Sequence, residues 1–201
     1  YGHFTQNDPR WARLGYGKMR NGGMSTMANG GCGPTAMANA INNVYGRNVT
    51  NPLTIANYAS KNGYSVDGGT SAGLFNRGAK GLGVNSSAIS KSGSSIANQL
   101  RHGKNVIVAG RGGSAYTSAG HIMSVRGIDR GGNAIVDDPM RRKSRHIPMN
   151  KLTRGMTHAW SIGRGPGDAY YGTSPDGSNY AFLSDYLTAL GNNPTYYDTS
   201  S

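Results

Sequence analysis

The sequence predicts an α+β fold in which N-terminal helices pack on a C-terminal antiparallel sheet. The first half of the chain carries helical spacing of apolar residues, and the second half carries short apolar runs between Gly, Asn and Asp. Helices followed by neighbouring short strands are typical of the α+β class. The 32 glycines and the 36% hydrophobic content of the 201 residues indicate a loop-rich protein rather than a helical bundle.

One helix is predicted directly after Cys32. Apolar residues at positions 37, 40, 41, 44 and 45 share one helical face, while Pro34 suits a first turn and Gly46 a helix end. Asn51 and Pro52 predict the start of a second helix, which runs to about Asn62. Shorter helices are predicted over 70–80 and 94–102, and the Gly-rich segment 1–31 is predicted to be irregular.

The strands are predicted in the second half of the chain. The clearest apolar run is Val106-Ile107-Val108, and two further runs are separated by Asp129-Arg130-Gly131-Gly132, which suits a hairpin turn. The predicted strands cover residues 105–109, 121–128, 133–137, 145–149 and 158–162.

The composition divides the chain into a basic body and an acidic tail. All 21 Lys and Arg residues lie at or before Arg164, with five of the nine Asp residues, so this part carries a formal charge of +16 and the rest −4. We expect a domain over 1–164 and a polar, Tyr-rich extension or linker over 165–201, with one helix near 182–190. No apolar run is long enough to span a membrane. The basic body either binds polyanions or only keeps the protein soluble.

Cys32 is the one cysteine, so the chain forms no internal disulfide and no cysteine-based zinc site. It is either a small buried apolar residue or a reactive thiol. The predicted helix start favours the second interpretation, because a helix N-terminus stabilises a thiolate. The neighbouring glycines would let a substrate carbonyl approach the backbone amide of Cys32.

His121 is the best candidate for a general base among the five histidines. It follows Ala119-Gly120 and opens an apolar strand, whereas His102 suits a helix end. Asp138 ends the next strand, so a hairpin would place it beside His121, where a carboxylate could orient the imidazole. Each feature alone has an ordinary structural explanation, and their order along the chain favours catalysis.

The segment Gly31-Cys32-Gly33-Pro34-Thr35-Ala36-Met37-Ala38 resembles the nucleophile motif of cysteine peptidase family 39, the bacteriocin-leader-peptidase-like group of the papain clan. Gly120-His121 is similar to the histidine motif of that family, and Val136-Asp137-Asp138-Pro139 to its Asp-Pro motif. The resemblance covers residues 6 to 162 and implies a papain-like fold. It also implies a catalytic set of Cys32, His121 and Asp138.

The same resemblance implies a side-chain donor to the oxyanion. Gln6, in Gln6-Asn7-Asp8-Pro9-Arg10-Trp11, is similar to a glutamine that precedes the cysteine in the family, and Asn29 is the alternative. In the transporter-linked members this glutamine lies only a few residues before the cysteine. The wider spacing here resembles the freestanding branch found in secreted bacterial and phage proteins.

These features predict a cysteine hydrolase that cleaves a peptide of the bacterial cell wall, with no cofactor and no metal. We expect an extracellular or virion-associated protein, which could form one module of a larger phage or secreted chain. The alternatives are a protein or leader-peptide endopeptidase, and a non-catalytic module that binds polyanions. Nucleic-acid binding through the cluster 141–145 is not favoured, because no recognised reader motif accompanies it.

Overall fold

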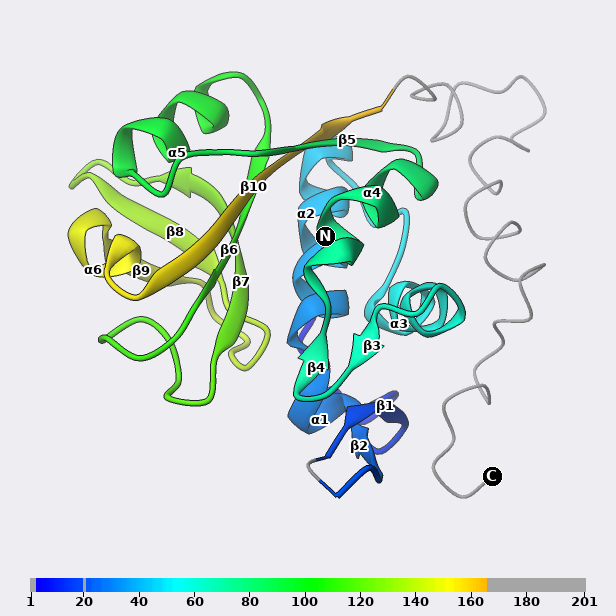
Figure 1. Ribbon diagram of the computed structural model, residues 1–201. Coiled ribbons are helices and arrows are strands. Elements are labelled where there is room, and N and C mark those ends of the chain that lie inside the picture. Colours follow the sequence, from blue (N-terminus) through cyan, green and yellow to red (C-terminus); the bar gives the residue numbers. More distant parts are fainter. Residues whose placement is uncertain (1–2, 20, 166–201) are drawn as a thin grey trace, which may run out of the picture.

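The computed structural model describes residues 3–19 and 21–165, and its largest sheet has six antiparallel strands. The helices and the sheet confirm the predicted α+β class and the papain-like arrangement (Figure 1). In spatial order the strands are β5 (Val84–Ala88), β10 (Met156–Arg164), β6 (Asn105–Gly110), β7 (His121–Ile128), β8 (Asn133–Asp137) and β9 (Arg145–Pro148).

The central helix α2 (Cys32–Tyr45) lies between the sheet and the rest of the N-terminal half. Figure 1 shows α2 with the sheet on one side and α3 (Pro52–Lys61) on the other. The helix contacts β6, β7 and β10, and α5 (Gly93–Arg101) also packs on β6 and β7. The N-terminus of α2 therefore comes close to the end of the sheet where β7 begins.

The alternation of side chains along β6 divides the core into two clusters. Ile107 packs with Trp160 and α2, whereas its neighbours Val106 and Val108 pack in a second cluster with Ile96 of α5. Both clusters consist of buried apolar side chains, so both faces of the central strands are covered. This explains why the run 106–109 is apolar throughout rather than alternating.

The prediction that residues 1–31 are irregular is wrong for their second half. A small hairpin pairs β1 (Gly15–Lys18) with β2 (Met24–Thr26), and a single turn, α1 (Met27–Gly30), leads to Cys32. Glycines interrupt any apolar alternation in these strands. A contact with a distant segment helps to hold the hairpin in place, because the Gly17 amide donates a hydrogen bond to Ser65 Oγ at 2.9 Å.

The single helix predicted over 70–80 is also wrong. The chain forms β3 (Ser65–Val66), β4 (Gly69–Thr70), the 3₁₀ turn η1 (Ala72–Phe75) and the short helix α4 (Arg77–Gly81). Asn76 leaves helical geometry between η1 and α4, with φ −105° and ψ −95°. The ring of Tyr64 lies against both turns, where a Cβ on Gly73 or Gly78 would meet it at 2.8 or 2.9 Å.

Two further elements of the described residues, β5 and α6, were not predicted from the sequence. The edge strand β5 is mostly polar and exposed, so it lacks the apolar pattern of the central strands. The short helix α6 (Met149–Thr153) begins where the predicted strand 145–149 was to end.

The predicted extension over 165–201 and the helix near 182–190 fall outside the described residues, apart from Gly165. Within the described part of the chain, no helix has the length and apolar character needed to cross a bilayer.

Candidate active site

Cys32 is the first residue of α2 and is half-buried. The first backbone N–H groups of a helix have no partner within it, so the Cys32 amide lies among unsatisfied donors. The dipole of a 14-residue helix adds positive potential at this point. The thiol therefore lies at the surface end of the helix, which contradicts the interpretation of Cys32 as a buried apolar residue.

The glycines around Cys32 have a packing role that the sequence did not indicate. A Cβ on Gly33 would overlap the Thr70 side chain, and Tyr16 Oη holds Thr70 Oγ1 in place at 2.7 Å. A Cβ on Gly31 would overlap Met27. Both glycines let the first turn of α2 lie directly against α1 and β4, which sets the position of the thiol.

His121 and Asp138 lie side by side, as the hairpin prediction requires. The strands β7 and β8 pair antiparallel with Ser124 opposite Asp137, so the start of β7 meets the chain that follows β8. His121 Nε2 lies 2.7 Å from Asp138 Oδ1, and both side chains are buried, with 7% and 4% of their areas exposed. This pairing leaves Nδ1 as the ring nitrogen available to another group.

Two further hydrogen-bond donors and one longer ion-pair contact hold Asp138. Its Oδ1 accepts from the Met140 amide at 2.9 Å, and its Oδ2 accepts from Arg145 Nη1 at 3.0 Å. Arg145 also donates to the carbonyl of Ala115, and Arg141 Nε lies 3.8 Å from Asp138 Oδ2. Each oxygen of the Asp138 carboxylate is thus held by its own set of contacts.

Asp137 points to the other side of the sheet, as strand alternation predicts. Its carboxylate accepts from Arg126 Nε at 3.1 Å and from Ser144 Oγ at 2.8 Å on Oδ1, and from Asn43 Nδ2 at 3.1 Å on Oδ2. Only 1% of its side chain is exposed. Asp137 therefore ties β8 to α2 and takes no part in the His121 pair.

The electrostatics favour opposite charges on His121 and Asp138. Burial of the ring acts to lower the pKa of His121, but hydrogen bonds with Asp138 and Cys32 and the charges of both raise it to about 9. Burial acts to raise the pKa of Asp138, but the hydrogen bond and charge of His121, with the Met140 amide and Arg145, lower it to about 2. The imidazolium and the carboxylate thus persist together across neutral pH.

An open cleft of about 380 Å³ brings the two halves of the molecule together at Cys32. One wall comes from the turn between β3 and β4, and the other from the end of β6 and the starts of β7 and β10. A peptide in this cleft would reach both the sulfur and the imidazole. The lining residues are Cys32, Asp67, Gly68, Thr70, Ala109, Gly110, Arg111, Ala119, Gly120, His121, Ile122, Thr157 and His158.

Gln6 and Asn29, the two predicted side-chain donors, occupy different environments. Gln6 is buried, and its Nε2 donates to the carbonyl of Ala28 at 2.8 Å and to that of Met27 at 3.4 Å. Asn29 is exposed on α1. Neither residue lines the cleft, but Gln6 binds the turn that leads directly into Cys32.

The sequence reasoning missed Arg145 as part of this site. In the sequence it stands out only as a member of the basic cluster 141–145, through which nucleic-acid binding was not favoured. Instead its side chain is 20% exposed and bonds to Asp138 and Ala115. No local pattern marks this contact, because it depends on the turn after β8.

No group of three or more His, Cys, Asp or Glu side chains gathers as a metal site among residues 3–19 and 21–165.

Comparisons with known proteins agree with this fold. A family model, the Peptidase_C39 like family, matches residues 5–163. The crystal structure of the peptidase domain of Streptococcus ComA, a bifunctional ABC transporter involved in quorum sensing, aligns with a TM-score of 0.51 at 18% identity. It covers 76% of this chain and 98% of that domain. A protein described as a C39-like peptidase from Bacillus anthracis aligns with a TM-score of 0.50 at 14% identity, covering 79% and 92%. No curated protein matches the chain in sequence.

Proposed function

The chain belongs to the Peptidase_C39 like family, a family of cysteine peptidases, and from this premise we propose that it hydrolyses amide bonds through Cys32, His121 and Asp138. Cys32 is the nucleophile, His121 the general base and acid, and Asp138 the group that orients the imidazole. The observation that carries the proposal is the convergence of a thiol at a helix start with a paired imidazole in one open cleft.

The proposed reaction has two steps. The Cys32 thiolate attacks the carbonyl carbon of the scissile amide, and the His121 imidazolium gives its proton to the departing amine nitrogen as the C–N bond breaks. Water then attacks the thioester while His121 takes a proton from that water, and the C–S bond breaks to release the Cys32 thiolate and a carboxylic acid, which restores the thiolate–imidazolium pair. Asp138 keeps its charge throughout and stabilises the imidazolium.

The oxyanion of each tetrahedral intermediate needs donors. The Cys32 amide is the first, since it lies at the unsatisfied end of α2. We assign the second to Gln6, whose longer bond to the Met27 carbonyl, at 3.4 Å, is the weaker of its two and can be exchanged for substrate. Asn29 remains the alternative donor, because it lies in α1, the turn directly before Cys32.

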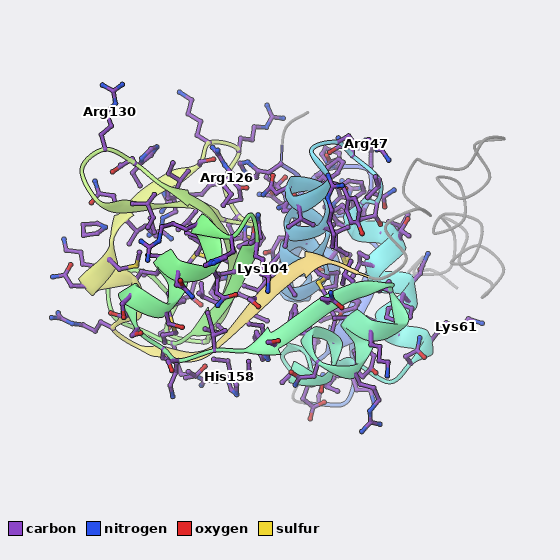
Figure 2. All side chains as sticks on the ribbon, turned by 90° about the horizontal axis from the view of Figure 1, so that it is seen from above. Arg47, Lys61, Lys104, Arg126, Arg130 and His158 are labelled. Atoms are coloured by element: carbon purple, nitrogen blue, oxygen red, sulfur yellow. The ribbon has the colours of Figure 1, made fainter. Side chains whose placement is uncertain are left out.

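The proposed substrate is the peptide part of bacterial cell wall. The formal charge of +16 up to Arg164 would attract the protein to anionic wall polymers. Figure 2 shows Arg47, Lys61 and Arg130 projecting outward from different parts of the molecule, so attraction would not depend on one docking patch. The proposed location follows from this substrate: the protein acts outside the cell or as part of a virion, as a module of a phage or secreted protein.

Digestion of purified cell walls tests the proposal. The full chain should release muropeptides with newly exposed termini, identified by mass spectrometry, and Cys32→Ala should release none while keeping the circular dichroism spectrum of the folded protein. Casein-type substrates run beside the walls. Cleavage of casein but not of walls would support a protein endopeptidase instead. If the protein cleaves neither cell walls nor casein, and Cys32 is alkylated slowly below pH 7, a polyanion-binding module without activity would be favoured.

A further inference from the structure

Two residues of opposite charge, Arg111 and Asp67, line the active-site cleft. Arg111 follows the last residue of β6, and Asp67 lies on the turn between β3 and β4, so they belong to opposite walls. Both are exposed. A peptide that enters the cleft must pass a cation on one wall and an anion on the other.

Arg111 is held close to the imidazole. Its backbone amide donates to the Gly155 carbonyl at 2.9 Å, and the preceding residue, Gly110, pairs with His121 in the sheet. The guanidinium lies over Gly120, where Nη2 is 3.6 Å from the position that a Cβ would take. Gly120 directly precedes His121 and has φ +104°, so a side chain is disfavoured there in any case. The guanidinium can therefore occupy this place beside the catalytic histidine.

The guanidinium of Arg111 has no hydrogen bond or ion pair with any residue in 3–19 or 21–165. Other arginines of the domain differ: Arg145 bonds to Asp138, Arg126 to Asp137 and Arg10 to Asp8. Asp67 likewise makes no side-chain bond within these ranges. An arginine presents a planar fork of donors that matches a carboxylate in two parallel hydrogen bonds, and such a pair orients its ligand.

We propose that Arg111 binds a carboxylate of the substrate next to the scissile amide, so that the peptidase selects acidic peptides. Asp67 repels the same carboxylate from the opposite wall and thereby sets the direction in which the peptide lies. The inference rests on the proposed function, since it assigns the specificity of that site. It applies to a side-chain carboxylate or a free α-carboxylate within reach of the cleft.

Alkylation of the single cysteine tests the charge of the cleft without knowledge of the substrate. Iodoacetate and iodoacetamide differ only by a carboxylate against a carboxamide, and Cys32 is the one thiol in the chain. The ratio of the two rate constants cancels any general change in thiol reactivity. Arg111→Gln should lower the iodoacetate to iodoacetamide ratio by roughly fivefold, the scale of one exposed charge pair. Asp67→Asn should raise it.

Arg130→Gln is the matched control, because it removes the same charge from the exposed turn where Arg130 points away from the molecule (Figure 2). It should leave the ratio unchanged. An equal ratio in the wild-type protein and in Arg111→Gln would overturn the inference. An equal fall of the ratio in Arg130→Gln would do the same, since net charge alone would then be the cause.

Peptide hydrolysis provides the second measurement. Peptide pairs that differ only by Glu against Gln, or by a free against an amidated C-terminus, should be cleaved with kcat/KM values about tenfold apart by the wild-type protein. Arg111→Gln should reduce that preference to near unity. Equal cleavage of both members by the wild-type protein refutes the carboxylate assignment and leaves the peptidase proposal intact. Failure to cleave any of these peptides, casein or purified cell walls, even with rapid alkylation of Cys32, refutes both.

Discussion

Arg145 Nη1 donates to Asp138 Oδ2 at 3.0 Å, on the oxygen opposite to the one that pairs with His121 Nε2. The same guanidinium nitrogen donates to the Ala115 carbonyl, so the position of Arg145 is fixed from two sides. The carboxylate is thereby prevented from rotating about its own bond. Its orientation toward the imidazole depends on a residue that lies seven positions away along the chain.

Substitution of Arg145 should affect both orientation and charge. Arg145→Met should lower kcat by about tenfold, which corresponds to about 1.4 kcal/mol in the barrier. It should also raise the pKa of His121, because a positive charge near the ring is removed, and so move the basic limb of the pH–rate profile to higher pH. Arg142→Met, an exposed change on the same turn, is the control. A basic limb that stays in place would mean that Arg145 supports only the fold.

Asp138→Asn should move the profile in the opposite direction. The carboxylate is one cause of the raised pKa of His121, about 9, and its loss should let the imidazolium deprotonate at lower pH. The basic limb of the kcat profile should therefore shift to lower pH. The maximal rate should fall by roughly 10²–10⁴-fold, the usual range for general acid–base catalysis. A pH–rate series on any cleaved peptide measures both effects, and an unshifted limb would contradict the assigned pairing.

The two candidate oxyanion donors can be separated by substitution. Gln6→Ala should lower kcat by about 10²–10³-fold without abolishing turnover, as for the loss of one oxyanion donor. Asn29→Ala should have little effect, because the side chain is exposed on α1. Since Gln6 also bonds to Ala28 and Met27, the thermal midpoint should be measured on both variants. A large fall in kcat for Asn29→Ala alone would reverse the assignment.

Gly33→Ala should displace the start of α2. The added methyl group overlaps the Thr70 side chain, which Tyr16 holds in place, so either the helix or the turn must shift. Overpacking of this kind costs about 1–3 kcal/mol of unfolding free energy. The rate of Cys32 alkylation should also fall. Gly127→Ala is the control, since its Cβ would find nothing nearer than 3.7 Å, and chemical denaturation compares the two variants.

Local sequence patterns were sufficient for the elements that carry the site. The apolar spacing after Cys32 predicted a helix, and the structure has it from Cys32 to Tyr45. The strand that opens with His121 and the turn of Asp129-Arg130-Gly131-Gly132 predicted a hairpin, and pairing of β7 with β8 follows from it. Both patterns depend on neighbours within a few residues, so composition and period reveal them.

Local patterns failed where glycines and polar residues replace the apolar period. The hairpin of β1 and β2 has almost no alternation, and its position depends on a bond from Gly17 to the distant Ser65. The segment 70–80 contains helix-forming residues, but packing against Tyr64 and the geometry of Asn76 divide it into separate turns. In both segments, contacts with other parts of the chain override local propensity.

Local patterns in the amino-acid sequence were enough to select the candidate catalytic groups: a thiol at a helix start, an imidazole at a strand start and a carboxylate at the end of the next strand. How these groups are held, and what surrounds them, depends on the folding of distant segments against one another. This folding alone placed Arg145 on Asp138 and left Arg111 without a partner in the described part of the cleft. The physical reason is that such contacts depend on distances between separate elements, which no local period encodes.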